Sequence, residues 1–169
     1  MASKEMIKKL NEQLNKEFYS SNLYLQMSAW CDTQGLQGSA VFLRTHANEE
    51  MMHMMKFFTY ISELGELAVI GKIEAPPTGF KSLNQLMDEV LKHEKFVTQS
   101  IHILTDAAWA EKDHATYNFL QWFVGEQHEE EALVNSIIDK LKLVGIDNRQ
   151  GLFFVDRELG QMTGEPAAE

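Results

Sequence analysis

The sequence predicts an all-α protein: a four-helix bundle with one long crossover between the second and third helices, plus a short C-terminal fifth helix. Apolar side chains recur every three or four positions over four separate stretches of about 28 residues each, which is the period of a helix with one buried face. Only three prolines occur in 169 residues. The one long irregular stretch, residues 65–82, lies between the second and third periodic segments.

The first helix is expected from about Lys4 to Asp32, and the second from about Ser39 to Leu64. The connection between them, residues 33–38, is so short that the two helices should be antiparallel neighbours. A single carboxylate interrupts the apolar stripe of each helix, at Glu17 in the first and Glu50 in the second. An unpaired charge in a core is too costly to be accidental.

Residues 65–82 contain three glycines and a Pro-Pro pair, which exclude a helix. Fully extended, the segment could span ~55 Å at ~3.3 Å per residue, enough to cross the length of the bundle. Ser82, with Gln85 three residues later, resembles a capping box that opens the third helix. The stripe of that helix, Leu83 to Ala108, is interrupted by Glu94.

Asp113 is the expected N-cap of the fourth helix, which should end at Gly145. Its apolar stripe is interrupted by a Gln-x-x-Glu pair, Gln127 and Glu130. The segment from Asp147 to about Gly160 is periodic but too short to join the bundle as an equal member, so a short last helix is expected there.

The four inward carboxylates, Glu17, Glu50, Glu94 and Glu130, each fall near the middle of a helix, so packing should bring them to one level. No Lys or Arg lies on the stripes, which leaves protonation or cations to neutralise them. His53, three residues after Glu50 on the same helix face, adds a neutral nitrogen ligand that favours a transition metal over Mg²⁺ or Ca²⁺. One such residue alone would more often be a satisfied core group, whereas four at one height favour metal.

Composition limits the alternatives. The net charge of −10 argues against nucleic acid or an anionic membrane as partner, and no apolar run approaches the ~20 residues of a bilayer span. A single cysteine, Cys31, excludes an internal disulfide and any four-cysteine metal site. The N-terminus reads as the start of an amphipathic helix rather than a signal peptide, so a soluble, cytoplasmic protein is expected.

At these residues the sequence resembles the ferritin superfamily, and more closely the non-haem bacterial ferritins, over nearly its whole length. Four segments carry the resemblance: Asn-Lys-Glu-Phe-Tyr-Ser-Ser around Glu17, Ala-Asn-Glu-Glu-Met-Met-His around Glu50, Lys-His-Glu around Glu94, and Asn-Phe-Leu-Gln-Trp-Phe-Val-Gly-Glu-Gln-His-Glu-Glu-Glu around Glu130. The resemblance implies a single ferritin-like diiron domain over residues 1–169.

The resemblance also implies a ferroxidase. Glu17, Glu50 and His53 would hold the first iron, and Glu94 and Glu130 the second, with Glu50 bridging. Gln127 would sit beside the second iron. Fe(II) would be oxidised by dioxygen or hydrogen peroxide, and ferric mineral would be stored in a hollow shell of 24 self-associated copies.

Three further metal ligands follow from the same resemblance, together with a role for Tyr24. Glu49, Glu126 and Glu129 match a third iron site that shares Glu130. The alternative is a solvated acidic face, but three carboxylates at one height repel one another unless a cation joins them. Tyr24 would be a redox-active neighbour of the iron, with packing as the alternative, and Trp122 is a weaker candidate for the same role.

No haem is expected. Gln127 and Glu130 stand where haem-containing bacterioferritins carry a Glu-x-x-His pair. Met51 follows Glu50, as the haem methionine follows its glutamate in those proteins, but the group Met51, Met52, Met54 and Met55 is more simply explained as core filling.

The remaining histidines have no evident metal partners in the sequence and are interpreted as surface or interface residues: His46, His93, His102, His114 and His128. Besides an iron-storage ferroxidase, the open alternatives are a haem-containing bacterioferritin-like protein, a diiron oxygenase and a metal-free helical module.

Overall fold

The protein, seen in a computed structural model that describes residues 2–145 and 147–162, is built of five helices, and no strand occurs among these residues. The all-α prediction is confirmed. The observed helices are α1 Lys4–Thr33, α2 Gln37–Glu63, α3 Leu83–Ala110, α4 His114–Val144 and α5 Arg149–Leu159. None of the helices in this described part has the length and apolar character needed to span a bilayer.

The helices begin where side chains can satisfy their first free N–H groups. The Ser3 side chain accepts from the N–H of Met6 in α1, and Asp113 accepts from the N–H of Thr116 in α4. At α3 the Ser82 hydroxyl accepts from the Gln85 N–H as predicted. The reciprocal bond of a capping box is not formed, because the Gln85 side chain accepts from the N–H of Lys81 instead.

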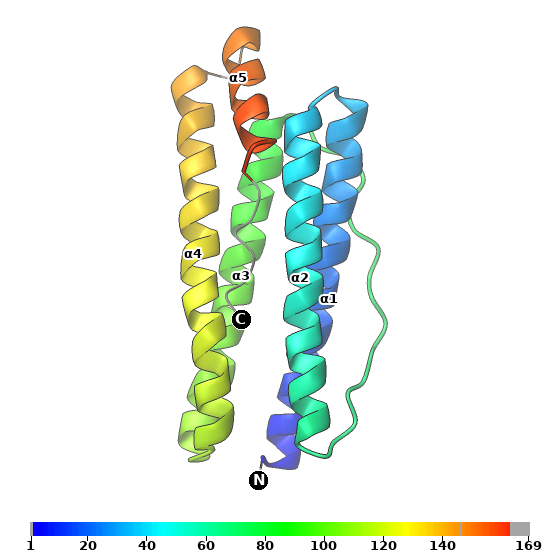
Figure 1. Ribbon diagram of the computed structural model, residues 1–169, viewed down its shortest axis with the longest axis vertical. Coiled ribbons are helices and arrows are strands. Elements are labelled where there is room, and N and C mark those ends of the chain that lie inside the picture. Colours follow the sequence, from blue (N-terminus) through cyan, green and yellow to red (C-terminus); the bar gives the residue numbers. More distant parts are fainter. Residues whose placement is uncertain (1, 146, 163–169) are drawn as a thin grey trace.

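The long crossover returns the chain to the end of the bundle where α2 began, so α2 and α3 run in the same direction (Figure 1). Two asparagines of α1 hold this segment by its backbone. Asn11 pairs with the carbonyl of Leu67 and the N–H of Val69, and Asn15 pairs with the carbonyl of Val69 and the N–H of Gly71. Four hydrogen bonds therefore replace the ladder that a helix or sheet would have given this irregular backbone.

The apolar core of the bundle is divided into two parts. One cluster, which includes Leu43, Met87 and Ile137, also contains Val155 and Leu159 of α5. The other includes Leu10, Phe57, Ile101 and Phe123 and fills the opposite end. Between them lies a layer of polar residues that are only 1–7% exposed: Glu17, Glu50, His53, Glu94, Gln127 and Glu130.

The short helix α5 completes the start of α2. The N-cap residue of α2, Leu36, has no side chain that can cap. Asp156 of α5 supplies the missing acceptors: one carboxylate oxygen lies 3.1 Å from the Gly38 N–H nitrogen, and the other lies 2.7 Å from both the Ser39 nitrogen and its hydroxyl. A carboxylate at this position also complements the positive end of the α2 dipole.

This contact predicts opposite effects for two glycine substitutions. A Cβ at Gly38 would lie 1.7 Å from the Asp156 carbonyl oxygen, so Gly38→Ala should displace α5 and lower the free energy of unfolding by about 1–3 kcal/mol. A Cβ at Gly125, inside α4, meets nothing within 4 Å, so Gly125→Ala should stabilise by about 0.5–1 kcal/mol. Guanidinium unfolding of both variants tests this, and equal stabilities would refute the tight α2–α5 contact.

Candidate metal centre

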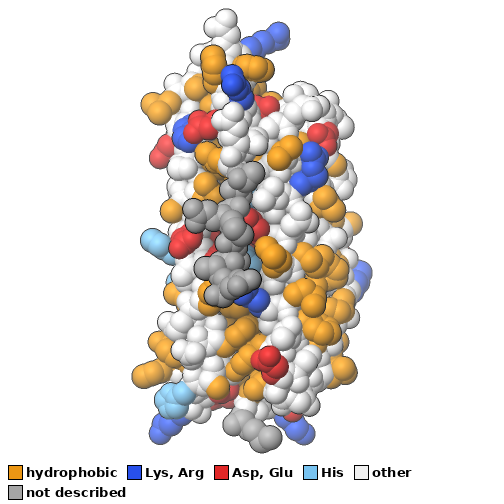
Figure 2. Space-filling view, viewed as in Figure 1, with side chains coloured by type: hydrophobic (Ala, Val, Ile, Leu, Met, Phe, Trp, Pro, Cys, Tyr) orange, Lys and Arg blue, Asp and Glu red, His pale blue; other side chains and the backbone are white. Residues whose placement is uncertain are grey.

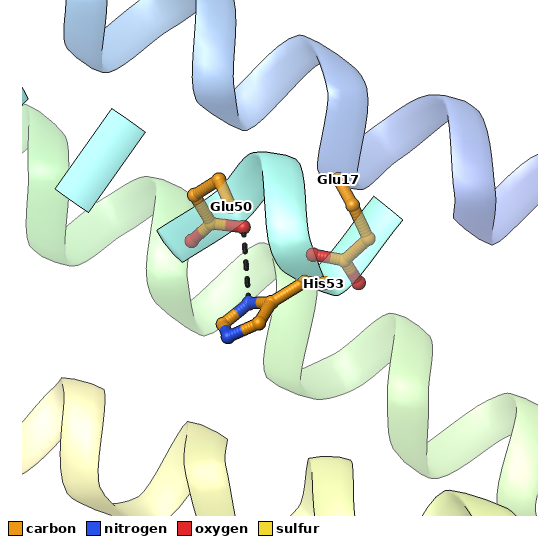
Figure 3. Close-up of side chains that lie close together, drawn as sticks. All are labelled: Glu17, Glu50 and His53. Carbon is orange, nitrogen blue, oxygen red and sulfur yellow. Dashed lines mark ion pairs between the residues drawn. The ribbon is translucent and has the colours of Figure 1, made fainter. Parts of the chain in front are cut away.

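The first cluster of candidate ligands is formed by α1 and α2. Glu50 and His53 are three residues apart on one face of α2, and Glu17 faces them from α1 (Figure 3). One ligand atom from each of the three residues can be chosen so that all lie within 4.8 Å of one another. The His53 Nδ1 atom is 3.4 Å from Glu50 Oε2. The structure therefore brings together the residues that the sequence assigned to the first site.

The polar layer leaves ligand atoms without partners. Five buried side-chain atoms in the described residues have no hydrogen-bond partner: Glu17 Oε2, His46 Nε2, Glu50 Oε2, His53 Nδ1 and Glu130 Oε2. Buried polar atoms are nearly always paired, so each of these demands an explanation. A set of unpaired carboxylate oxygens and imidazole nitrogens is the donor set of a transition-metal site, and it fits iron.

Glu94 lies on α3, opposite the first cluster, and is held from both sides. The Tyr24 hydroxyl donates to Glu94 Oε1, and the Gln127 side-chain nitrogen donates to Glu94 Oε2 at 2.9 Å. Gln127 therefore contacts the carboxylate predicted for the second site. Tyr24 is 1% exposed, so its hydroxyl is as deeply buried as the carboxylate that it contacts.

Glu130 contacts a histidine that was predicted to lie at the surface or at an interface. His46 Nε2 is 3.3 Å from Glu130 Oε2, and His46, Glu49 and Glu130 form a second group with ligand atoms within 4.8 Å. His46 is only 6% exposed, so its interpretation as a surface or interface residue is wrong. The signal was present in the sequence: His46 precedes Glu49 by three residues, the same helical spacing that singled out Glu50 and His53.

The four acids predicted for the third site do not converge in the described structure. Glu49 joins Glu130 as expected, but His46 completes that group. Glu126 lies nearer the first cluster, with its Oε1 atom 3.8 Å from His53 Nε2. Glu129 is exposed and lines a groove between α2 and α4.

That groove has a volume of about 790 Å³ and reaches the polar layer. Its walls are largely aromatic and apolar, its inner end includes His53, and its acids are Glu49, Glu63, Glu126 and Glu129. The Lys56 ammonium lies over the Trp122 ring, 4.2 Å from its centre. Apolar side chains also gather over the lower half of α2 on this face of the molecule (Figure 2).

The methionine group of α2 does not fill the core uniformly. Met54 is 6% exposed and belongs to the buried cluster, but Met52 and Met55 are 48% and 45% exposed. Core filling is therefore the wrong explanation for these two residues. The histidine His93 also departs from a plain surface position, because its ring packs between Tyr19 and Tyr24.

Burial sets the charge state of the layer. Desolvation, reinforced by the neighbouring Glu50, raises the pKa of Glu17 to about 8, and the hydrogen bond from Gln13 opposes this rise. Desolvation and then the charge of Glu130 raise the pKa of Glu94 to about 7. The pKa of Glu50 is raised well above its ordinary value by desolvation and by Glu94. A cation among these groups would remove the repulsion and allow them to ionise.

Burial and neighbouring charges also shift the pKa values of the outer acids and of His46. Desolvation raises the pKa of Glu49 and of Glu126. Burial alone would lower the pKa of His46, but the contact with Glu130 and the charge of Glu49 outweigh it, so the pKa is raised. Desolvation and the adjacent Glu94 raise the pKa of Tyr24, which keeps its hydroxyl protonated and donating to that carboxylate.

A bundle that carries a carboxylate inward from each of its four long helices, with two buried histidines of α2 beside them and five unpaired ligand atoms in the described residues, defines a metal-binding carboxylate bundle. The chain belongs to the ferritin family: the family model described as a ferritin-like domain matches residues 7–144.

Named relatives agree with this membership. The chain is 54% identical over 163 residues to a probable bacterial non-haem ferritin-like protein of Haemophilus influenzae, covering 96% of this chain and 98% of that protein. It is 51% identical over 162 residues to the bacterial non-haem ferritin of Escherichia coli O6:H1, covering 96% and 98%.

Solved structures agree as well. A humanized archaeal ferritin superposes with a TM-score of 0.95 at 41% identity, covering 98% of this chain and all of that one, 100%. An open-pore ferritin from Archaeoglobus fulgidus superposes with a TM-score of 0.91 at 44% identity, covering 94% and 96%. The predicted family and bundle architecture are thereby confirmed.

The raised carboxyl pKa values predict that the metal-free protein loses stability as pH rises. Because the folded pKa of Glu17 is about 8 against 4.5 unfolded, the folded state keeps a proton that the unfolded state releases between these values. The stability that this proton contributes is fully present below pH 4.5, and about 3 kcal/mol of it is lost by pH 7. Guanidinium unfolding of the metal-free protein at a series of pH values measures this.

Glu17→Gln should flatten that pH dependence, because the amide does not titrate. Glu12→Gln, an exposed acid on the same helix, is the matched control and should leave the slope unchanged. A slope in Glu17→Gln as steep as in the unmodified protein would show that Glu17 does not carry the buried proton.

Proposed function

We propose that this protein is an iron-storage ferritin that oxidises Fe(II) to Fe(III) at a dinuclear centre inside each subunit and keeps the ferric product within a hollow 24-subunit shell. The observation that carries the proposal is the buried polar layer, in which Glu17, Glu50, His53 and Glu130 each hold an unpaired ligand atom. Membership of the ferritin family and the similarity to bacterial non-haem ferritins support iron as the metal.

In this proposal the residues of α1 and α2 bind the first Fe(II). Glu17 and Glu50 supply carboxylate oxygens, and His53 supplies Nδ1, a buried ring nitrogen with no hydrogen-bond partner. Glu94 and Glu130 bind the second Fe(II), with Glu50 shared between the two. The second site is richer in oxygen donors than the first, so it should hold Fe(II) less firmly.

In this proposal, oxidation at the layer involves both the transfer of electrons from Fe(II) and the release of protons from carboxyl groups. Each Fe(II) gives up one electron, and dioxygen or hydrogen peroxide takes up two. At neutral pH without metal, Glu17, with a pKa of about 8, is mostly protonated and Glu94, with a pKa of about 7, is about half protonated; both release these protons as Fe(II) binds. Tyr24 donates a hydrogen bond to Glu94, which puts an oxidisable phenol directly beside the second site.

A third iron position is proposed beside the dinuclear centre. His46 and Glu49 are its core, Glu130 is shared with the second site, and Glu126 and Glu129 line the groove that leads outward. An acidic groove that reaches from this layer to the surface gives cations a route between the centre and the outside of the subunit.

Self-association into the shell is supported by the surface of α2. Met52, Met55 and Phe58 are 36–48% exposed on one helix, an apolar group that an isolated bundle would leave in water. The ferritin structures to which the chain is similar support the same conclusion. We further propose a cytoplasmic protein without haem, because Gln127 stands where a haem-type ferritin would have a glutamate.

The alternative of a diiron oxygenase fits the groove less well. Such an enzyme would need a pocket for an organic substrate at the metal centre. The groove has apolar walls, but its four carboxylates at Glu49, Glu63, Glu126 and Glu129 favour a cation over an uncharged substrate.

Substitution of the shared carboxylate tests the dinuclear assignment. Glu50→Ala should abolish rapid oxidation, because both Fe(II) sites lose a ligand, while the metal-free protein keeps or gains stability through loss of a buried acid. Stopped-flow absorbance at two Fe(II) per subunit measures the rate. The exposed Glu12→Ala serves as control and should oxidise normally. An unchanged rate in Glu50→Ala would overturn the assignment.

The third position predicts a separate phenotype. His46→Ala combined with Glu49→Ala should leave the first two Fe(II) per subunit oxidising fast, because the dinuclear ligands remain, yet change the ratio of iron oxidised to oxygen consumed. Oxygen-electrode measurement at two and then more Fe(II) per subunit gives that ratio. His102→Ala, an exposed histidine of α3, is the control. A ratio equal to that of the unmodified protein would return His46 and Glu49 to a structural role.

A further inference from the structure

A chain of hydrogen bonds runs from the protein surface to one oxygen of Glu17. The Lys16 ammonium donates to the Ser100 hydroxyl at 2.5 Å, and that hydroxyl donates to Gln13 Oε1 at 2.6 Å. Gln13 Nε2 then donates to Glu17 Oε1 at 2.7 Å. Gln13 is 1% exposed and Ser100 is 8% exposed, so the inner part of the chain is shielded from water.

The direction of this chain is fixed by the chemistry of its outer end. A lysine ammonium has hydrogens to donate and no lone pair to accept, so the Ser100 oxygen must be the acceptor in that bond. The hydroxyl hydrogen of Ser100 is then free for the nearest acceptor, Gln13 Oε1. The Gln13 amide is thereby oriented with its NH₂ group toward Glu17.

At the inner end of these hydrogen bonds, the two oxygens of the Glu17 carboxylate have different surroundings. Oε1 accepts from Gln13, whereas Oε2 has no hydrogen-bond partner. Figure 3 shows the Glu17 carboxylate turned toward Glu50 and His53. If the amide were reversed, two oxygens would face each other at hydrogen-bond distance, and the carboxylate would have to rotate away.

We propose that Gln13 is a positioning residue for the first metal site: it holds Glu17 by one oxygen so that the other faces Glu50 and His53, and Ser100 with Lys16 fixes the direction of its amide. This inference rests on the proposed function, because it assigns a role toward the same metal.

The second site has a comparable arrangement. Its outermost charged group is an acid, Glu131, where the first site has Lys16. The Thr98 hydroxyl donates to Glu131 Oε1 at 2.6 Å, so its lone pairs remain for the Gln127 NH₂ group, 3.4 Å away. Gln127 also donates to Glu94 Oε2. In both halves of the layer a glutamine amide therefore donates to a carboxylate: Gln13 to Glu17 on α1, and Gln127 to Glu94 on α3.

Binding of redox-inert metals to the assembled protein tests the proposal without relying on oxidation. Gln13→Met keeps the length of the side chain but cannot donate, so the dissociation constant of Zn²⁺ at the first site should rise about 10–100-fold. The visible spectrum of bound Co²⁺ should change as Glu17 rotates. Ser100→Ala should raise the dissociation constant less, and Ser100→Thr, which restores a hydroxyl, should return it to within about threefold of the unmodified protein. Isothermal titration calorimetry and Co²⁺ absorbance give these quantities.

Two further variants distinguish a failure of the role proposed for Gln13 from a failure of the proposed metal site. Gln99→Met, an exposed neighbour of Ser100, should bind Zn²⁺ normally. Zn²⁺ affinity and Co²⁺ spectrum unchanged in Gln13→Met, while Glu17→Ala loses the site, would overturn the positioning role alone. Zn²⁺ binding unchanged in Glu17→Ala as well would overturn the proposed metal site and this inference together.

Discussion

The structure depends on keeping four carboxylates inside an apolar bundle. Glu17, Glu50, Glu94 and Glu130 lie in one layer, 1–7% exposed, with apolar clusters on either side. Desolvation and mutual repulsion raise the pKa of Glu17 to about 8, so without a cation the protonated form of this carboxyl is favoured at neutral pH. In the proposed function, a bound metal would replace those protons and pair the free ligand atoms. Apolar side chains of similar size in place of these carboxyls would therefore be expected to stabilise the metal-free bundle.

Most of the fold could be predicted because each long helix carries its own repeat of apolar residues and is bounded by residues that typically begin or end helices. The N-cap at Asp113 and the end at Gly145 follow from local chemistry alone. The layer was also predictable, since carboxylates such as Glu94 interrupt apolar stripes at matching heights. Helical spacing alone linked Glu50 to His53, and the structure brings them within 3.4 Å.

The remainder depends on contacts between distant segments, which no local pattern encodes. Asp156 caps α2 from a helix more than a hundred residues later, so its role appears only after α5 has packed. His46 was misjudged although its spacing to Glu49 is visible in the sequence, because its nearer partner, Glu130, lies on another helix. Gln13 passed unnoticed for the same reason: its direction is set by Ser100, 87 positions away. The side chains that tune the layer are those whose partners come from other helices.

The central claim is that the polar layer holds two iron ions between the four long helices. Crystals of the protein grown without metal, soaked anaerobically in Fe(II) and measured on both sides of the iron absorption edge, test it most directly. The account predicts two anomalous peaks in each subunit, one among Glu17, Glu50 and His53 and one among Glu50, Glu94 and Glu130. Anomalous peaks confined to the outer surface, with none in the layer, would contradict it.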